Sequence, residues 1–360
     1  MHDASIAQKI TKYQQSFEPH FTQYFNNLKK EFIPTKNSKQ IPACLRLLEN
    51  LALNGGKRQR VAFVYESYKL LKNKTSKHDT DALLSASISI ELLQAHLLIH
   101  DDIVDDAPIR RGMNSTYYSL KEMTGSEKDA LGMAIMTGDI AAYLTLQVLQ
   151  KAKINEPIKL KLIQNQIETG LNTFAGQIYD LERDANPIKD ITLKMITELA
   201  NLKTANYTVI SPMYLGLIIA NGTEADFKKI GKYASLAGIA FQMQDDLLGV
   251  FGNEKKLGKS TLSDIREGKK TALVKYTLSK CSTAEEKEIN SILGNKKSTK
   301  KQIDRVKEIM KKHKADVFAQ NEAETYALKA INEAKSWTNY NKEAVDFFIQ
   351  SAQWVIEREL

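Results

Sequence analysis

Residues 82–106 read ALLSASISIELLQAHLLIHDDIVDD, an apolar stretch that ends in four aspartates. Apolar residues recur at three- and four-residue steps and cover most faces, so the segment predicts a helix surrounded by other helices. The last turn of a helix carries partial negative charge, and neighbouring carboxylates raise each other's pKa. Acids gathered at this position are unfavourable unless a divalent cation binds them.

A second segment has the same design. Residues 228–249 read KKIGKYASLAGIAFQMQDDLLG and again end near paired aspartates, Asp245 and Asp246. Two central helices that bring their carboxylates to one end of a bundle are the simplest architecture that uses both clusters. Asp101 and Asp105 lie one helical turn apart, so their carboxylates can share Mg²⁺ ions. Alone, the first cluster could be a solvated acidic turn, but the second favours a metal site.

The helical period extends over most of the chain. Pro212 falls inside one predicted helix, at a position where it can kink that helix. No hairpin signal is evident, so the predicted fold class is all-α, a helical bundle around a central cavity. We expect one domain over residues 1–360, in which the charged segment 283–360 forms outer helices. Helices are predicted over residues 43–53, 58–73, 80–104, 127–150, 154–183, 189–221, 224–250 and 340–358.

Composition bounds the functional class. Of the 360 residues, 51 are Lys or Arg and 43 are Asp or Glu, and no basic segment is interleaved with aromatics, so no nucleic-acid partner is expected. The two cysteines, Cys44 and Cys281, lack the spacing of a metal site. Residues 1–10 hold no apolar run, and the apolar window 82–99 contains Glu91. We expect no signal peptide, no transmembrane segment and a cytoplasmic location.

Cationic segments accompany the acidic clusters. Arg110 and Arg111 follow the first cluster, and guanidinium groups bind phosphate in a fork geometry; ion pairs with Asp105 and Asp106 are the alternative. Residues 54–60, NGGKRQR, place three cations at a glycine turn before a helix, where backbone N–H groups favour anions. A loop after the second cluster, rich in cations and small residues, could close over a phosphate or remain a surface loop. Acids and cations together are what a metal–diphosphate site requires.

Together these segments resemble the trans-isoprenyl diphosphate synthases, the farnesyl and geranylgeranyl diphosphate synthase family. The resemblance covers roughly residues 40–280. It rests on ELLQA, HDDIVD and RRG between Glu91 and Gly112, on FQMQDDLLG at 241–249, and on GGKRQR at 55–60. The acidic clusters also lie in the order and at the separation that the family shows.

Three positions depart from the family pattern. Val61 replaces a proline. Gly249 stands where many members have a third aspartate, which alters the surroundings of the metal more than its direct ligands. Gln94 stands where many members have histidine, and glutamine can still donate to a phosphate oxygen.

The resemblance implies a homodimer and three Mg²⁺ ions, held by Asp101, Asp105 and Asp245. It implies isopentenyl diphosphate and an allylic prenyl diphosphate as substrates. Lys203, Thr204 and Gln242 are implied as catalytic residues, with Thr204 and Gln242 near the developing cation. The positions implied to hold isopentenyl diphosphate are Lys57, Arg60, Gln94 and Arg111, and those implied to hold the allylic diphosphate are Arg110, Lys203, Lys259 and Lys269.

The implied reaction is a head-to-tail condensation. Mg²⁺ and cationic side chains neutralise the leaving diphosphate, and the allylic C–O bond ionises. An apolar cavity keeps water from the carbocation, while dipoles stabilise it. The double bond of isopentenyl diphosphate attacks, and a proton leaves, in the family to the released diphosphate. No protein nucleophile is required, and none is evident.

The growing prenyl tail is expected to run along the helix before Asp101. Leu97 lies one turn back on the same face, and His96 lies to one side. In the family, bulky aromatics at these two positions often stop growth at C15. Neither is Phe or Tyr here, so C20 geranylgeranyl diphosphate is the expected product, with farnesyl or a longer polyprenyl diphosphate as alternatives. His96 could instead be a packed core histidine, with deeper residues such as Leu93 setting the length.

Other functional classes fit less well. A non-catalytic partner subunit of a heteromeric synthase typically loses one or both acidic clusters, and both are present here. A terpene cyclase or a head-to-head synthase does not account for GGKRQR, which should hold the non-allylic substrate. A metal-dependent phosphohydrolase would need a general base or a histidine cluster that the sequence does not make evident.

Overall fold

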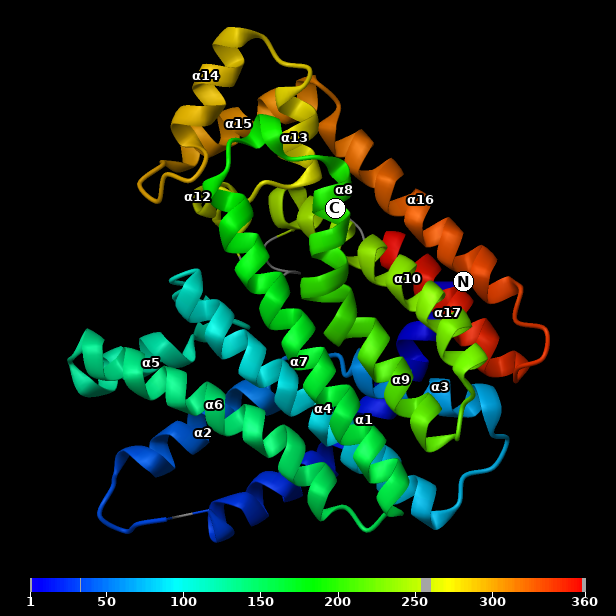
Figure 1. Cartoon of the computed structure of the whole chain (residues 1–360). Coiled ribbons are helices and arrows are strands. Elements are labelled where there is room, and N and C mark those ends of the chain that lie inside the picture. Colours follow the sequence, from blue (N-terminus) through cyan, green and yellow to red (C-terminus); the bar gives the residue numbers. More distant parts are fainter. Residues whose placement is uncertain (1, 33, 254–259, 358–360) are drawn as a thin grey trace. The chain divides into compact units, whose positions relative to one another are not determined.

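A computed structural model describes residues 2–32, 34–253 and 260–357, and its regular structure is almost entirely helical (Figure 1). The all-α prediction is therefore confirmed. The chain divides into two compact units, each built from separate stretches of sequence. Unit 1 comprises residues 1–170, 211–227 and 340–344, and unit 2 comprises residues 171–210, 228–339 and 345–360.

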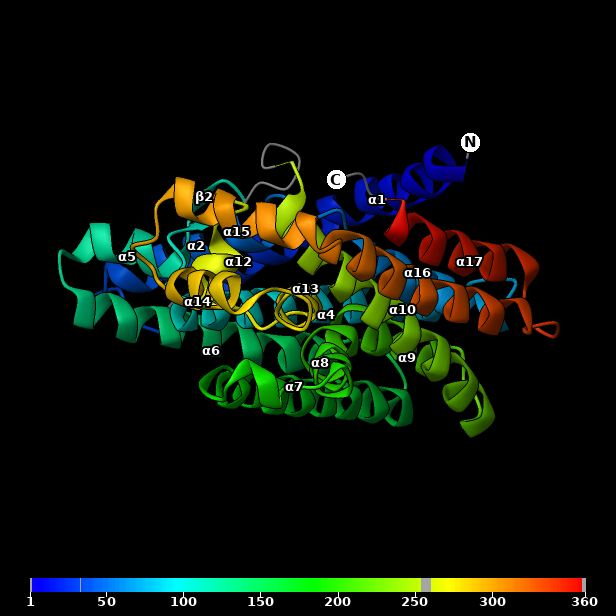
Figure 2. The same cartoon turned by 90° about the horizontal axis from the view of Figure 1, so that it is seen from above.

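Unit 1 surrounds the first acidic segment. Its long central helix, α4, packs against α2, α3, α6 and α9 (Figure 2). The elements of this unit are α1 (His2–Glu31), α2 (Gln40–Leu53), α3 (Gln59–Leu71), α4 (Lys77–Val104), β1 (Ile109–Arg110), β2 (Met113–Asn114), α5 (Thr116–Thr124), α6 (Glu127–Lys151), the first half of α7 (Glu156–Ala185) and α9 (Ser211–Ile219).

The sequence fixes α4 at both ends. Ser76 and Asp79 form a capping box that satisfies backbone N–H groups at the start. The helix ends at Val104, and the backbone N–H of Asp105 still donates to the carbonyl of Asp101 at 2.9 Å. The predicted one-turn relation between these two aspartates is therefore confirmed.

Three features of unit 1 were not predicted from the sequence: the helices α1 and α5 and the β1–β2 hairpin. Residues 2–31 form the helix α1, whose buried Phe17, Phe21 and Phe25 recur at four-residue steps. The expectation of no hairpin is also wrong, because β1 and β2 pair in antiparallel. Arg111 and Gly112 form its turn with φ of +54° and +77°. Two-residue hairpin turns usually have the sequence Asn-Gly or Asp-Gly. Here an arginine takes the first position, so the sequence did not indicate a hairpin.

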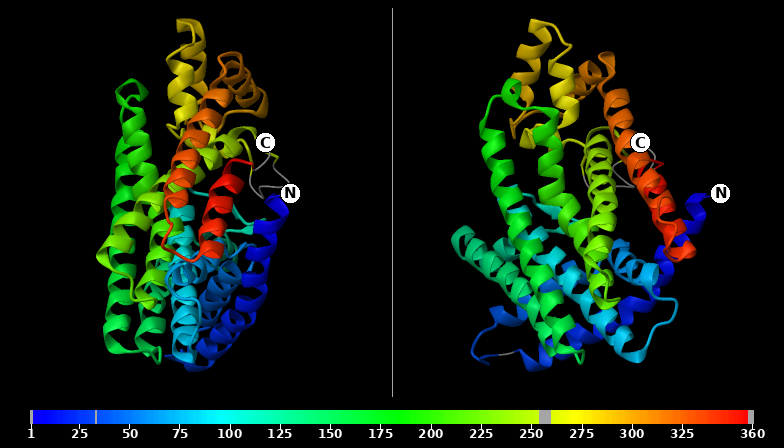
Figure 3. Two further views of the ribbon diagram at one scale, coloured as in Figure 1. Left: turned by 90° about the vertical axis from the view of Figure 1, so that its right-hand side faces the viewer. Right: turned by 45° about the vertical axis from the view of Figure 1, so that its right-hand side comes forward.

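Unit 2 carries the second acidic segment on α10. In this unit α13, α14 and α15 gather around the start of α16 (Figure 3). Its elements are the second half of α7, η1 (Ile188–Asp190), α8 (Leu193–Leu199), η2 (Ala200–Ile210), most of α10 (Glu224–Phe251), α12 (Ser263–Glu267), α13 (Ala272–Leu278), α14 (Thr283–Ile292), α15 (Lys300–Lys312), α16 (Ala315–Lys335) and most of α17 (Lys342–Ile356).

The segment 189–221, predicted as one α-helix, changes its helix type along its length. It consists of α8, the π-helix η2 and α9, and η2 ends just before the Ser211–Pro212 pair. Proline cannot donate the next helical hydrogen bond, and π-helical turns often occur at functional sites. The wider turns of η2 carry Lys203 and Thr204, two of the residues singled out from the sequence.

Among the residues that the structure describes, two helices, α4 and α6, are long and apolar enough to cross a membrane by length and composition alone. In the most apolar window of α4, 72% of the residues are buried within the protein, whereas the figure for α6 is 33%. The apolar surface of α4 is therefore used by the core, while α6 keeps an open apolar face.

Candidate functional site

The end of α4 presents three carboxylates to different surroundings. Asp101 and Asp105 are half-buried, and Asp102 is buried. Burial raises the pKa of Asp102 to about 6, although Arg110 opposes the shift. Two partly accessible carboxylates beside a buried one form an oxygen donor set of the kind that Mg²⁺ prefers.

Arg110 from the hairpin binds this cluster. Its Nη2 donates to Asp101 Oδ2 at 3.2 Å, and its Nε donates to Asp102 Oδ1 at 2.7 Å. The alternative that arose from the sequence paired the arginines with Asp105 and Asp106, whereas these contacts are to Asp101 and Asp102. The guanidinium of Arg110 therefore brings a positive charge against both carboxylates.

Residues 54–60, which carry three cationic side chains, form a turn in unit 1 with two residues at positive φ. Gly55 has φ of +79°, and Arg58, at the N-terminal cap of α3, has φ of +56°. The side chain of Arg58 turns inward, where its Nη1 donates to Glu91 Oε2 at 2.6 Å and its Nη2 to the carbonyl of Leu53 at 3.0 Å. Arg58 is therefore a structural cation, whereas its neighbour Lys57 is exposed.

Arg111 connects the hairpin to this turn. Its Nη1 donates to the carbonyls of Leu51 and Asn54, each at 2.7 Å. A Cβ on Gly55 would lie 3.1 Å from Arg111 Cδ, so glycine permits the close approach. Burial lowers the pKa of Arg111 to about 10, which leaves it charged at neutral pH. The contacts place two of the predicted isopentenyl diphosphate segments, 54–60 and the hairpin, side by side in unit 1.

In unit 2 the polar residues predicted from the sequence form two groups of contacts. Lys203 Nζ lies 2.8 Å from Asp180 Oδ2. Thr204 donates through Oγ1 to Gln242 Oε1, and Gln242 Nε2 donates to Asp246 Oδ1 at 2.6 Å. The half-buried Asp245 precedes Asp246 on α10.

Asp180 was missed by sequence reasoning. It lies on α7 one turn after Gly176, and a Cβ on Gly176 would lie only 2.8 Å from the backbone nitrogen of Lys203. Gly176 is thus a packing glycine that lets α7 approach η2, which brings Asp180 within reach of Lys203. The Gly176-Gln177 interruption in an apolar helix was the available signal, but periodicity could not decide its meaning.

The remaining predicted diphosphate ligands are less clustered. Lys269 Nζ lies 2.8 Å from Glu267 Oε2 and 3.3 Å from Asp264 Oδ1, so nearby acids hold it in unit 2. Arg60 and Gln94 are half-buried in unit 1. Lys259 lies outside the described residues.

The two predicted chain-length residues have different surroundings. His96 is buried, and its Nδ1 lies 2.9 Å from the carbonyl oxygen of Gly138 on α6. Burial, followed by the neighbouring His100, lowers the pKa of His96 to about 4, so its imidazole is neutral at pH 7. Leu97 is half-buried and packs on the apolar cluster that contains Leu93.

Comparison with known proteins extends over most of the chain. Residues 41–311 match the family described as polyprenyl synthetase. A geranylgeranyl diphosphate synthase from Sulfolobus acidocaldarius is 30% identical over 94% of this chain and 99% of its own length. A protein of the same name from Saccharolobus solfataricus is 33% identical over 84% of this chain and 87% of its own.

The fold has close counterparts among solved structures. A geranylgeranyl pyrophosphate synthase from Corynebacterium glutamicum, in complex with isoprenyl diphosphate and magnesium, superimposes with a TM-score of 0.88. That comparison covers 97% of this chain and 99% of the other, at 25% sequence identity. The acidic clusters, the GGKRQR turn and the extent of these matches agree, and the chain belongs to the polyprenyl synthetase family of prenyltransferases.

Proposed function

We propose that this prenyltransferase condenses isopentenyl diphosphate head-to-tail with an allylic prenyl diphosphate and releases diphosphate. Geranylgeranyl diphosphate, C20, is the proposed product, as the names of its relatives suggest. The observation that carries the proposal is the cluster at the end of α4, where Asp101 and Asp102 hold the guanidinium of Arg110. Carboxylates and a guanidinium in one place can bind both a metal ion and the anion that accompanies it.

The oxygen donors fit Mg²⁺, which the Corynebacterium relative contains. We assign three ions to Asp101, Asp105 and Asp245. Bound there, Mg²⁺ would supply charge neutralisation and orientation for the diphosphates. Asp101 would hold Mg²⁺ through the carboxylate that Arg110 contacts, so the metal and the guanidinium would lie at the same acidic cluster.

The cations divide between the two substrates. Lys57, Arg60, Gln94 and Arg111 would hold isopentenyl diphosphate. Arg111 donates through Nη1 to two backbone carbonyls, and these hydrogen bonds fix the orientation of its guanidinium. The edge of the guanidinium away from Nη1 would then bind a phosphate oxygen. The proposed ligands of the allylic diphosphate are Arg110, Lys203, Lys259 and Lys269.

The network on η2 and α10 would stabilise the developing carbocation. Thr204 donates its hydroxyl proton to Gln242, and Gln242 donates to Asp246, so each dipole is oriented before the substrate arrives. Oriented dipoles stabilise charge without the cost of reorganising at the moment of reaction. The wider turns of η2 place Thr204 in this network, which gives the π-helix a role in the site.

The proposal is tested by incubating the purified protein with Mg²⁺, labelled isopentenyl diphosphate and, separately, C5, C10 and C15 allylic diphosphates. Products are dephosphorylated and sized by chromatography. We expect chains that end at C20 with at least one primer. No elongation with any primer, in a folded protein that still binds diphosphate, would indicate a non-catalytic partner subunit; chains that end at C15 or beyond C20 would indicate a farnesyl or longer polyprenyl synthase.

Leu97→Phe is expected to shorten the product. The larger side chain would meet the prenyl tail one turn below Asp101, and overpacking of this kind costs about 1–3 kcal/mol. Because about 1.4 kcal/mol changes a rate tenfold, the C15:C20 ratio should rise about tenfold or more. The ratio is read from the same chromatographic assay.

Leu98→Phe is the matched control for this change. Leu98 is also half-buried on α4, but it packs on the cluster that contains Phe21 and Phe25, whereas Leu97 packs on the cluster with Leu93. The control variant should retain C20 as its main product. Equal shortening in both variants would contradict the placement of the tail beside Leu97.

We also propose a homodimer formed through open apolar faces. On α7 an exposed apolar stripe recurs at three-, four- and seven-residue steps, which place its members on one face of the helix. On α6, Met136 and Tyr143 are likewise exposed, at 56% and 77%. Such a face on a long helix is typical of a partner surface. The α7 stripe consists of Leu160, Ile167, Leu171, Phe174, Ile178 and Leu181.

The double variant Leu171→Lys/Ile178→Lys is expected to be monomeric at micromolar concentration in sedimentation velocity. Both side chains are more than 60% exposed within one chain, so the variant should still fold. Asn172→Lys is the control, because Asn172 is exposed on α7 away from the stripe and should leave the dimer intact. A double variant that sediments as a dimer would contradict this assignment.

The last part of the proposal concerns domain organisation and cellular location. Residues 1–360 act as one synthase domain in the cytoplasm, and neither α4 nor α6 spans a membrane. The burial of the apolar window of α4 and the use of α6 in the dimer would account for their composition. Segment 283–360 contributes to the core of unit 2 through buried Ile289, Val306 and Ile309, so it is more than a set of charged outer helices.

A further inference from the structure

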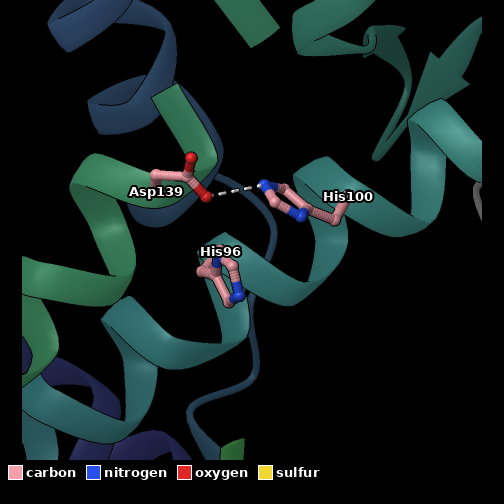
Figure 4. Close-up of side chains that lie close together, drawn as sticks. All are labelled: His96, His100 and Asp139. Atoms are coloured by element: carbon pink, nitrogen blue, oxygen red, sulfur yellow. Dashed lines mark ion pairs between the residues drawn. The ribbon is translucent and has the colours of Figure 1, made fainter. Parts of the chain in front are cut away.

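Next to the acidic cluster, α4 and α6 bring together two imidazoles and a carboxylate (Figure 4). His96 and His100 lie four residues apart on α4, so they share one face of the helix. Asp139 faces them from α6. One ligand atom from each of the three side chains lies within 4.8 Å of the other two. The cluster was not evident from the sequence, because its third member, Asp139, comes from another helix.

The spacing between His100 and Asp139 is close to that of two ligands on one metal ion. His100 Nε2 lies 3.5 Å from Asp139 Oδ1. Ligand atoms at about 2.0–2.1 Å from a tetrahedral Zn²⁺ ion are roughly 3.3 Å apart. The rings of His96 and His100 have centroids 4.5 Å apart and are inclined by 54°. Small side-chain shifts would therefore bring all three groups to coordination distance.

Gly138 orients both histidines. Its carbonyl oxygen can only accept a hydrogen bond, so the contact at 2.9 Å places a proton on Nδ1 of His96 and the lone pair on Nε2. Histidines that bind metals usually donate their other ring N–H to a carbonyl or a carboxylate in this way. The same glycine makes space for His100, because a Cβ at position 138 would lie 2.3 Å from both Cδ2 and Nε2 of that ring.

Access and ligand chemistry distinguish this cluster from the neighbouring aspartates. His96 is buried, whereas the side chains of His100 and Asp139 are 35% and 43% exposed, so an ion can enter from their side. His100 Nε2 also lies 3.3 Å from the carbonyl of Ile135, and coordination would replace that contact. Imidazole nitrogen suits Zn²⁺ and related transition metals, whereas Mg²⁺ prefers oxygen ligands.

We propose that His96, His100 and Asp139 form a site for one divalent transition-metal ion, with Zn²⁺ as the preferred ion. The site is distinct from the Mg²⁺ sites that we assign to the aspartate clusters. Three protein ligands leave a fourth position open to water. Because the ion would join α4 to α6, its binding should also stabilise the folded chain.

Co²⁺ tests the site without any measurement of turnover, because Co²⁺ bound by imidazole nitrogen absorbs visible light with an intensity that depends on its geometry. The full-length protein is titrated with Co²⁺ in a large excess of Mg²⁺, which occupies the oxygen-only sites. We expect each chain to bind one Co²⁺ ion, with the intense absorption of a Co²⁺ ion that has few ligands. Added Zn²⁺ should displace this Co²⁺ and abolish the absorption. A thermal melt with Zn²⁺ alone should show a raised midpoint.

Asp139→Asn decides the assignment, because Asp139 is partly exposed and its replacement is nearly isosteric. We expect at least about a tenfold loss of Co²⁺ affinity, since even changes to groups behind the ligands cost 10–100-fold. His96→Asn and Gly138→Ala should weaken binding as well, the latter by displacing the ring of His100. His78→Asn is the control, because His78 is exposed at the opposite end of α4.

Two results would overturn the proposal. One is a wild-type protein that shows no Co²⁺ spectrum in excess Mg²⁺. The other is equal Co²⁺ affinity in the wild type and in a folded Asp139→Asn variant, which would assign the binding to the aspartate clusters. A loss of binding in Asp139→Asn with no loss in His78→Asn supports it, and neither outcome depends on the prenyl transfer activity.

Discussion

Alanine at Asp101 or at Asp245 is expected to lower kcat/KM for prenyl chain elongation by about a thousandfold or more. Each change removes a proposed Mg²⁺ ligand, and metal ions supply several kcal/mol of charge stabilisation to the transition state. A loss of about 4 kcal/mol corresponds to about a thousandfold in rate. The measurement is incorporation of labelled isopentenyl diphosphate at saturating Mg²⁺ with the preferred allylic primer.

The Asp101 variant has a second expected effect. Arg110 bonds to both Asp101 and Asp102, so alanine at position 101 leaves its guanidinium on the buried Asp102 alone. We therefore expect a higher KM for the allylic substrate in Asp101→Ala, because Arg110 is a proposed ligand of that diphosphate. Asp245→Ala, which lies in the other unit, should not share this dependence on Arg110.

Asp81→Ala is the matched control for both variants. Asp81 is an exposed acid near the start of α4, far along the helix from the acidic cluster. Its replacement should leave kcat/KM within about twofold, since surface changes rarely exceed 0.5 kcal/mol. Retention of more than a tenth of wild-type kcat/KM in Asp101→Ala or Asp245→Ala would contradict their assignment as metal ligands.

The two acidic helices could be predicted from the sequence because their signals are local. An apolar period on most faces predicts burial, and a carboxylate cluster at the helix end is unfavourable without a cation. Both arguments use residues within one or two helical turns. The structure confirms α4 and α10 with ends close to the expected ones. That both clusters serve one substrate stays a prediction.

The contacts that organise the site join residues far apart in the chain. Arg58 pairs with Glu91, 33 positions later, and Lys203 pairs with Asp180, 23 positions earlier. Along the sequence Lys57, Arg58 and Arg60 look equivalent. The positive φ of Arg58 turns its side chain inward, and this depends on a partner that periodicity does not reveal.

Helix α1 was missed for a different physical reason. Its buried phenylalanines form a stripe one residue wide, and polar residues occupy most other positions. A helix that covers the surface of a core needs only such a stripe, whereas a central helix is apolar all round. The rule that identified α4 is therefore too strict for a peripheral helix such as α1.

Arg58→Met is expected to lower the free energy of unfolding by about 3–5 kcal/mol, because it leaves the carboxylate of Glu91 buried and uncompensated. Arg58 is 2% exposed and Glu91 is 3% exposed, so water cannot replace the lost partner. The guanidinium also lies over the rings of Phe17 and Phe21, at 5.9 and 5.5 Å from their centroids. Methionine retains part of this apolar contact, so the loss reports mainly on the ion pair. Urea denaturation followed by circular dichroism measures it.

The neighbouring Lys57 separates stability from binding. Lys57→Met should change the free energy of unfolding by less than about 0.5 kcal/mol, as expected of a surface position, while raising the KM for isopentenyl diphosphate. Arg58→Met should do the reverse at temperatures where it stays folded. The double variant Arg58→Met/Glu91→Leu should recover much of the lost stability, because no buried charge then remains and an apolar pair can replace a buried ion pair at little cost. Additive losses in the double variant would show that Arg58 and Glu91 stabilise the chain independently, and would contradict the assignment of the loss to their ion pair.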